Sequence, residues 1–366
     1  MASLESSDRP RRSPARILLF LLILAGGAVA TAEIGVRVRA HLRYGELLEI
    51  GELFDFDEQL GIRVGKPNLD VFFAKESQVN TDSFGFRSAE LEQPKPEGRF
   101  RLAFLGGSTT FNSFASSNET MWSYLVTKGL AERFPEADFD YVCGGVTGYR
   151  VKQSRIGFEH RIQPLEPDLV FIYHATNDLA EDSHGLAQAA GLVPAPRAPG
   201  FLEERSVLWR LIVKNLRYGA SQEAGLSEVA KLAFDPTETS PGFEERLRGL
   251  VEEVQATGAE VVLVTFTTKF RAEQPLEVQL ANLQQSFTFM PYLSPQDTLA
   301  GYVEYNRVIE KVAGETGALL IDERFSIPGD AAHFDDSVHF SDKGLEAQAA
   351  RVLRGLEAWD GPEASR

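Results

Sequence analysis

The sequence predicts an α/β protein: a three-layer α/β/α sandwich with a five-stranded parallel sheet, preceded by an N-terminal transmembrane helix. Five short apolar runs have the length and composition of buried strands, at residues 102–105, 141–143, 168–173, 260–266 and 318–321. Amphipathic stretches with helical spacing alternate with them, at about residues 121–133, 148–161, 243–256, 298–316 and 343–358. Because strands and helices alternate, right-handed crossovers make the strands parallel and cover both faces of the sheet.

The chain begins with a basic segment followed by an apolar one. Residues 1–16 contain four arginines, and about 20 apolar residues suffice to cross a bilayer, so residues 17–36 are predicted to be a transmembrane anchor with the basic end in the cytoplasm. Ala30 and Ala32 also fit a signal-peptidase site before Glu33, so a cleaved signal peptide and a secreted protein are the alternative. In both cases the remainder lies outside the cytoplasm. A buried core helix is disfavoured because the segment has no polar face.

Changes in amino-acid composition indicate the other domain boundaries of the chain. Residues 37–100 are polar and broken by glycine and proline, which indicates a stalk and lead-in segment. Residues 101–358 contain all the predicted strands and form the main domain. Two segments within it exceed ordinary connection lengths, at about 179–242 and 267–297. Both follow strands, at the sheet end where open α/β folds bind ligands, so they are predicted to form a lid, a substrate wall or a docking surface.

Composition excludes several classes of partner. The chain has 37 Lys and Arg against 53 Asp and Glu, and the net charge of −16 repels nucleic acids. Its single cysteine, Cys143, can form neither an intramolecular disulfide nor a thiolate metal cluster. The histidines show no His-x-x-x-His pair of the zinc type, and no Gly-x-Gly-x-x-Gly fingerprint follows a strand. We therefore expect no metal and no cofactor.

The first segment whose residues could take part in catalysis or binding follows the first strand of the main domain. Residues 104–110 read Phe-Leu-Gly-Gly-Ser-Thr-Thr, and the two glycines allow a tight turn that leaves Ser108 at the start of the next helix. Ser108 is then a nucleophile, part of a phosphate cradle, or only a helix N-cap. The phosphate interpretation is weakened because no lysine or arginine follows closely on the helix.

An Asp-x-x-His motif, Asp336 to His339, lies just before the last predicted helix. At this spacing the carboxylate can bind imidazole Nδ1 and leave Nε2 free to accept a proton from a hydroxyl, which with Ser108 completes a triad. The motif alone is weak, because a chain rich in aspartate produces one by chance, and a capped loop histidine is the simpler interpretation. Asp335 is adjacent, but the three-residue spacing favours Asp336 as the partner.

Two further segments supply hydrogen-bond donors, which a serine nucleophile needs to stabilise the oxyanion of a tetrahedral intermediate. After the second strand, the glycine-rich segment 143–149 can aim a backbone N–H inward, and Gly145 is the candidate. After the third strand, Asn177 presents a side-chain amide. The simpler interpretations are a turn before a helix for the glycine and an Asx turn for Asn177. His174, close by, is expected to be a core histidine rather than a polar residue of the site.

Together these four segments resemble the motifs of the SGNH (GDSL-like) hydrolase superfamily, in the same order and over most of the main domain. Gly-Gly-Ser-Thr at Ser108 matches the nucleophile turn, Gly145 the second block, Asn177 the third and the Asp-x-x-His motif the last. The resemblance implies the flavodoxin-like fold of this superfamily, with Ser108 as nucleophile, His339 as general base and then acid, and Asp336 as its orienting partner. It also implies an oxyanion hole formed by the N–H groups of Ser108 and Gly145 and the side chain of Asn177.

Two positions depart from the superfamily pattern. Cys143 occupies a place where an asparagine is common, and Ala175 stands where the third block has glycine, but neither change removes a catalytic atom. The segment 80–87 also looks like that of membrane-anchored bacterial members with an N-terminal helix. This resemblance implies an inner-membrane anchor and a domain in the periplasm or at the cell surface.

Three functions are compatible with these residues. The first is a serine esterase or deacetylase that removes small acyl groups from a carbohydrate or lipid of the cell envelope. The second is an O-acyltransferase of a polysaccharide, in which a sugar hydroxyl replaces water; sequence does not separate the two, because pocket shape and water exclusion select the acceptor. The third is a non-catalytic envelope binding or assembly protein. It is disfavoured because nothing would then require Ser108, Asp336 and His339 together.

Overall fold

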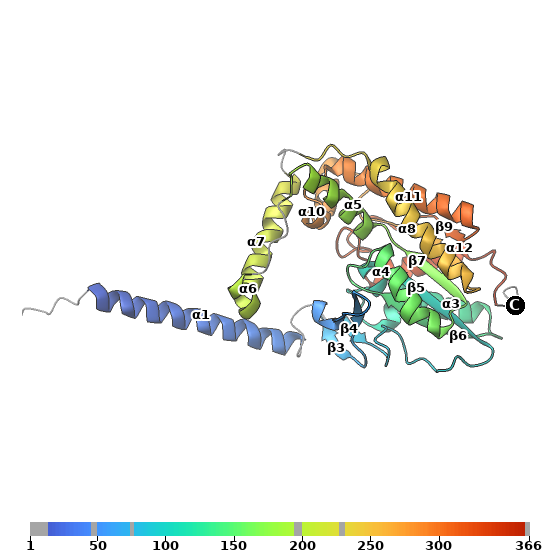
Figure 1. Cartoon of the computed structure of the whole chain (residues 1–366), viewed down its shortest axis with the longest axis horizontal. Coiled ribbons are helices and arrows are strands. Elements are labelled where there is room, and N and C mark those ends of the chain that lie inside the picture. Colours follow the sequence, from blue (N-terminus) through green and yellow to red (C-terminus); the bar gives the residue numbers. More distant parts are fainter. Residues whose placement is uncertain (1–13, 45–49, 74–76, 194–199, 227–230, 363–366) are drawn as a thin grey trace, which may run out of the picture.

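The computed structural model describes residues 14–44, 50–73, 77–193, 200–226 and 231–362 (Figure 1). At its centre is the predicted five-stranded parallel sheet, with strand order β6-β5-β7-β8-β9. The strands are β5 (Arg99–Gly106), β6 (Asp138–Gly145), β7 (Leu169–Tyr173), β8 (Glu260–Val264) and β9 (Leu319–Ile321). Nearly every residue of β5, β7 and β8 is buried, as expected for strands covered on both faces.

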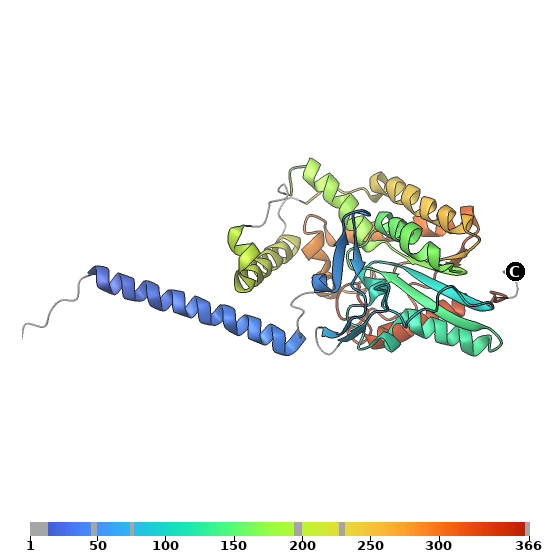
Figure 2. The same ribbon diagram turned by 60° about the horizontal axis from the view of Figure 1, so that its bottom comes forward.

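Helices cover both faces of this sheet, which confirms the predicted three-layer sandwich (Figure 2). The covering helices are α3 (Trp122–Arg133), α4 (Val151–Gly157), α5 (Thr176–Ala189), α8 (Pro236–Ala256), α11 (Pro295–Thr316) and α12 (Asp342–Gly355). On one face α3 packs against α12, and on the other α8 packs against α4 and α11. The winding therefore reverses at β5, and open α/β sheets bind their ligands at such a reversal.

The ends of two predicted helices differ from the structure. The helix expected over 243–256 begins at Pro236, where the Asp235 side chain accepts a hydrogen bond of 2.9 Å from the Thr237 N–H. The Ser-Pro-Gly sequence at 240–242 concealed these first turns, since proline and glycine ordinarily indicate loops. The helix expected over 148–161 begins only at Val151, and residues Phe158–Ile162 continue it as a wider π-helical turn.

The expected stalk is a folded structure over much of its length. The short 3-10 helix η1 (Ile50–Leu53) leads into two antiparallel hairpins, β1 (Phe54–Asp57) with β2 (Ile62–Gly65) and β3 (Asp70–Phe73) with β4 (Ser77–Asn80). A second, small core joins these hairpins to the main domain, formed by Leu53, Phe54, Ile62, Val79, Phe111, Val146 and Tyr149. The stalk interpretation of 37–100 is therefore wrong for residues 50–73 and 77–80. Short strands bury only every second side chain, so their average composition is polar.

The N-terminal helix α1 (Pro14–Tyr44) is longer than the predicted 17–36 and projects away from the domain (Figure 1). Its segment Pro14–Arg39 has a mean hydropathy of 2.3 and is not buried. By length and composition it is able to cross a membrane, and it is the one such helix among the described residues. These properties fit a membrane anchor and a signal sequence alike.

The two long segments predicted as insertions are largely helical. The first contributes the end of α5 and then α6 (Phe201–Arg205) and α7 (Val207–Leu226), and the second contributes α9 (Leu276–Leu283) and α10 (Ser286–Phe289). Helix α7 packs against α10 at one end and against α1 at the other. The insertions therefore add a helical layer between the sheet and α1.

Candidate active site

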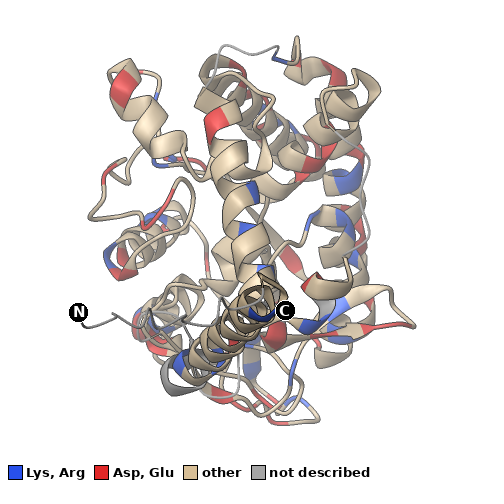
Figure 3. Cartoon of the chain, turned by 90° about the vertical axis from the view of Figure 1, so that its left-hand side faces the viewer, with Lys and Arg blue, Asp and Glu red and all other residues tan. Residues whose placement is uncertain are grey.

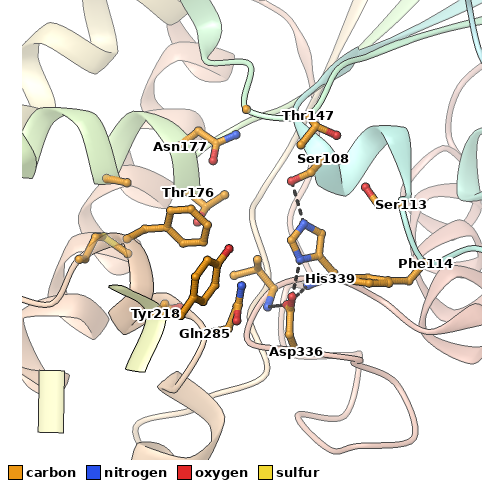
Figure 4. Close-up of a pocket in the computed structure, with 16 residues that line it drawn as sticks. Ser108, Ser113, Phe114, Thr147, Thr176, Asn177, Tyr218, Gln285, Asp336 and His339 are labelled. Atoms are coloured by element: carbon orange, nitrogen blue, oxygen red, sulfur yellow. Dashed lines mark hydrogen bonds and ion pairs between the residues drawn. The ribbon is translucent and has the colours of Figure 1, made fainter. Parts of the chain in front are cut away.

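Four of the predicted site residues, Ser108, Asn177, Asp336 and His339, come together at the carboxyl edge of the sheet (Figure 4). Ser108 is the first residue of the short helix α2 (Ser108–Phe111), directly after β5. Asn177 is the second residue of α5, directly after β7. Asp336 and His339 lie on the loop that leads into α12. The N-cap of α2 is Gly107, so the N-cap interpretation of Ser108 does not hold.

Ser108, His339 and Asp336 form one continuous hydrogen-bonded chain. His339 Nε2 lies 2.7 Å from Ser108 Oγ, and His339 Nδ1 lies 2.7 Å from Asp336 Oδ2. The other carboxylate oxygen of Asp336 accepts hydrogen bonds of 2.9 Å from the N–H groups of Val338 and His339. Burial raises the pKa of Asp336, but its interactions with His339 and these N–H groups outweigh burial and hold the pKa below its usual value. Asp336 is therefore ionised and fixes the ring of His339.

The same loop carries a second Asp-x-x-His motif, which the sequence analysis did not consider. His333 Nδ1 lies 2.7 Å from Asp330 Oδ1, the same distance as in the first pair. Asp-x-x-His geometry alone thus does not identify a catalytic histidine. Ser108 lies at the other ring nitrogen of His339, whereas among the described residues no serine hydroxyl is bonded to the ring of His333.

Gly145, the predicted backbone donor, does not line the site. It is the last residue of β6, and a Cβ there would lie 2.4 Å from the Phe111 nitrogen, so it is packed against α2. Gly148, three residues further on, lines the cavity and has a φ of 85° that favours glycine. In the described part of the chain, the N–H of Gly148 donates to no protein acceptor. The structure therefore replaces Gly145 by Gly148 as the candidate donor.

Asn177 lies where the sequence predicted it, beside the nucleophile turn (Figure 4). Its Nδ2 donates a hydrogen bond of 2.9 Å to the Tyr149 carbonyl, which fixes the amide and leaves its second N–H for a ligand. A Cβ on Gly107 would lie 2.7 Å from this nitrogen, so the glycine makes room for the amide next to Ser108. The hydrogen bond between the Tyr149 carbonyl and Asn177 thus holds the backbone of 148–149 and the amide side chain in fixed positions.

A cavity of about 280 Å³ opens in front of Ser108. Its polar lining includes Thr147, Thr176 and Gln285, and its apolar lining includes Phe114, Tyr218, Phe289, Met290 and Val338. The ring of Phe114 lies edge-on to the imidazole of His339, with centroids 5.4 Å apart. Sequence reasoning placed the insertions near the site but missed these wall residues, since nothing in the local pattern of α7 or α10 points to a ligand.

Two polar groups near the site belong to the protein interior. Burial lowers the pKa of His174 to about 3, and its Nε2 lies 2.8 Å from Ser154 Oγ, so it is the expected core histidine. Burial raises the pKa of Cys143 to about 11, so its thiol stays protonated. Among the described residues, no group of three or more His, Cys, Asp or Glu side chains could hold a metal ion.

Asp178 gives a testable dependence of stability on pH. Burial raises its pKa to about 7, and Arg246, whose Nε lies 3.4 Å from Oδ1, offsets burial only in part. Because this pKa lies above the unfolded-state value, the native state loses stability as pH rises from about 4 to about 7. We expect wild type to lose stability relative to Asp178→Asn between pH 5 and pH 8, measured as the free energy of unfolding in urea. A difference between the two proteins that is constant with pH would contradict this.

Comparison with known proteins assigns the chain to a family. The model of the GDSL-like lipase/acylhydrolase family matches residues 104–347, more than half of the chain. Among curated proteins, no sequence is similar enough to match.

The solved structures that match the chain have low sequence identity. An acetylxylan esterase from Geobacillus stearothermophilus is 19% identical with a TM-score of 0.43, and the match covers 70% of this chain and 94% of that one. An α/β hydrolase from the metagenome of Lake Arreo, Spain, is 16% identical with a TM-score of 0.43, and the match covers 72% and 97%. The family match carries the assignment: the chain belongs to the GDSL-like lipase/acylhydrolase family of serine esterases.

Proposed function

We propose that the chain hydrolyses short acyl esters by way of an acyl-enzyme on Ser108. Ser108 Oγ attacks the ester carbonyl carbon while its proton passes to His339 Nε2, and Asp336 stabilises the imidazolium that forms. The tetrahedral intermediate then expels the alcohol, which takes the proton from His339. Water attacks the acyl-enzyme in the same way and releases the carboxylic acid. The observation that carries this proposal is the pair of 2.7 Å contacts that His339 makes with Ser108 and Asp336.

The oxyanion of each intermediate needs donors on the side of Ser108 away from His339. We assign this role to the backbone N–H of Ser108, the backbone N–H of Gly148 and the Nδ2 of Asn177. Support comes from the place of all three residues in the cavity lining and from the unused N–H of Gly148 in the described chain. The Ser108 N–H points out of the first turn of α2, where no carbonyl of the same helix can accept it.

The size of the cavity and the presence of α1 limit the range of possible substrates. A volume of about 280 Å³ lies at the lower end of ligand pockets, which favours a small acyl group such as acetyl. The apolar α1 and the basic residues before it support an anchor with the domain outside the cytoplasm. Acylated carbohydrates or lipids of the cell envelope are the substrates that an esterase in this position would meet.

Covalent labelling tests the proposal directly. A fluorophosphonate loses fluoride to an activated serine and forms a stable Oγ–phosphorus bond. We expect peptide mass spectrometry to find this adduct on Ser108, and p-nitrophenyl acetate to be hydrolysed faster than the octanoate ester. Ser108→Ala should be neither labelled nor active, while Ser123→Ala, a change at a buried serine of α3 outside the cavity, should behave as wild type. An unlabelled wild type, or an adduct on a different serine, would contradict the assignment of Ser108 as the nucleophile.

A further inference from the structure

Helices α6 and α7, residues 201–226 and here called the arm, lie on the side of the domain from which α1 projects (Figures 1 and 2). Helix α7 runs across the direction of α1 instead of along it. If α1 crosses a bilayer, α7 is therefore oriented along the membrane surface and not into it.

The arm is attached to α1 at one carboxylate. Glu33 accepts hydrogen bonds from Ser206 Oγ at 2.8 Å and from the N–H groups of Val207 and Leu208 at 3.0 and 2.9 Å. These groups form the first turn of α7, where free N–H groups and the helix dipole favour an anion. Arg37 completes the junction, since its Nε lies 2.7 Å from Glu33. The one acidic residue of α1 thus has a defined partner in the arm.

The position of Glu33 places this junction at a bilayer surface. A helix rises about 1.5 Å per residue, so Pro14 to Glu33 spans about 29 Å, close to the ~30 Å of hydrocarbon in a bilayer. The arm therefore begins where α1 leaves the hydrocarbon.

Helix α7 is apolar on the side that faces away from the domain. Val207 and Gly225 are buried, and Tyr218 lines the active-site cavity, so these residues define the face toward the domain. Trp209, Ile212 and Leu216 follow the spacing i, i+3, i+7 on the opposite face and are 43%, 39% and 68% exposed. In α6, Phe201 and Leu202 are also exposed, at 68% and 52%. A soluble surface does not ordinarily align large apolar side chains in this way.

Helix α7 has an excess of basic residues, although the whole arm has four basic and three acidic ones. The whole chain has a net charge of −16, yet α7 contains Arg210, Lys214 and Arg217 against one acidic residue, Glu223. Figure 3 views the molecule from the side of α1 and shows basic residues on the helix that crosses this face. Arg217 pairs with Glu203 at 2.8 Å, while Arg210 forms no ion pair within the described part of the chain. Lys214, seven residues after Val207, lies on the face toward the domain. Long basic side chains beside an apolar stripe are typical of interfacial helices.

We infer that the arm is a membrane-binding surface whose partner is an anionic lipid bilayer. Trp209, Ile212 and Leu216 enter the boundary between headgroups and acyl chains, Arg210 contacts lipid phosphates beside them, and Glu33 fixes the arm to the span. Because α7 also carries Tyr218, the arm holds the wall of the active-site cavity beside the membrane. This inference rests on the proposed anchor, but it is independent of ester hydrolysis.

The tryptophans of the chain allow a direct test. Of the three, Trp122 and Trp359 are 0% and 7% exposed, so Trp209 is the one that lipid can reach. The full chain carrying Ser108→Ala is placed in anionic nanodiscs whose acyl chains either do or do not carry bromine, which quenches indole on contact. We expect bromine to remove most of the emission that Trp209 contributes, obtained as the difference from a Trp209→Phe variant. The emission of Trp209→Phe itself should not change.

A second variant controls for quenching that is not specific to the arm. Val303 is 60% exposed on α11, a helix outside the arm that packs against α8. Trp209→Phe combined with Val303→Trp should therefore be insensitive to bromine. Equal quenching of a tryptophan at position 303 would overturn the inference. So would an unquenched Trp209 in discs that contain the chain, which is the result expected if a second protein copy covers the arm. A chain that does not co-elute with the discs would overturn the anchor and this inference with it, while the triad proposal would stand.

Discussion

Replacement of His339 by asparagine is expected to lower kcat/KM for a short ester by about 10,000-fold or more, the loss found when a triad member is removed. Asparagine cannot accept the Ser108 proton at pH 7, and it cannot return a proton to the leaving alcohol. Its amide keeps a polar group near Asp336, so the fold should be preserved. The measurement is p-nitrophenyl acetate hydrolysis, together with urea unfolding of both proteins.

The second Asp-x-x-His motif provides a matched control. His333 is 8% exposed, lies six residues before His339 and makes the same 2.7 Å contact with an aspartate. His333→Asn removes an equivalent imidazole from the same loop, but not one that is bonded to Ser108. We expect its kcat/KM to remain near that of wild type. Equal losses in the two variants would mean that activity depends on the integrity of the loop, and the assignment of His339 as the base would be wrong.

The fold could be predicted from the sequence because its central strands are buried on both faces. Residues 102–105 and 169–173 are short, continuous apolar runs, and helical patterns separate them clearly. The hairpins of residues 54–80 could not be found in this way. Their strands have four residues each, and they are held by contacts with Phe111, Val146 and Tyr149 that lie far away in the sequence.

The site was predictable to the extent that its residues are local in sequence. Ser108 follows a strand through a Gly-Gly turn, and the Asp336 to His339 spacing suits a carboxylate–imidazole contact, so short motifs indicated both. The choice between Gly145 and Gly148 was not predictable, because both glycines follow the same apolar run. It depends on β6 continuing through Gly145, which only the pairing of Gly145 with Gly106 of β5 reveals.

The wall of the cavity could not be predicted, for a different reason. Tyr218 and Phe289 come from helices on separate insertions, and they meet only because α7 packs on α10. One contact shows how closely these helices approach: a Cβ on Gly225 would lie 2.4 Å from Phe287. Such packing depends on the shapes of two distant surfaces, which a hydrophobic pattern does not encode.

Replacement of Arg87 by methionine is expected to destabilise the protein by about 3 kcal/mol or more, the scale for leaving several buried acceptors unpaired. Arg87 is 1% exposed and donates to the carbonyls of Phe111 and Asn112 at 3.0 and 2.6 Å and of Gln78 at 2.9 Å. Burial lowers its pKa to about 10, so it remains charged at neutral pH. Methionine keeps an apolar stem of similar length but satisfies none of these oxygens. Urea unfolding measures the loss.

The same change should also reduce activity in the protein that remains folded. Arg87 connects β4 of the second hairpin to the last residue of α2, and α2 is a single turn that begins at Ser108. Loss of these bonds frees the end of α2, so we expect kcat to fall at least about tenfold, since misplacing a reacting group by an ångström has effects of this order. Arg63→Met, at an exposed position of β2, is the matched control and should change neither quantity. If Arg87→Met unfolded more easily but kept full kcat, the lead-in hairpins would stabilise the domain without positioning its nucleophile.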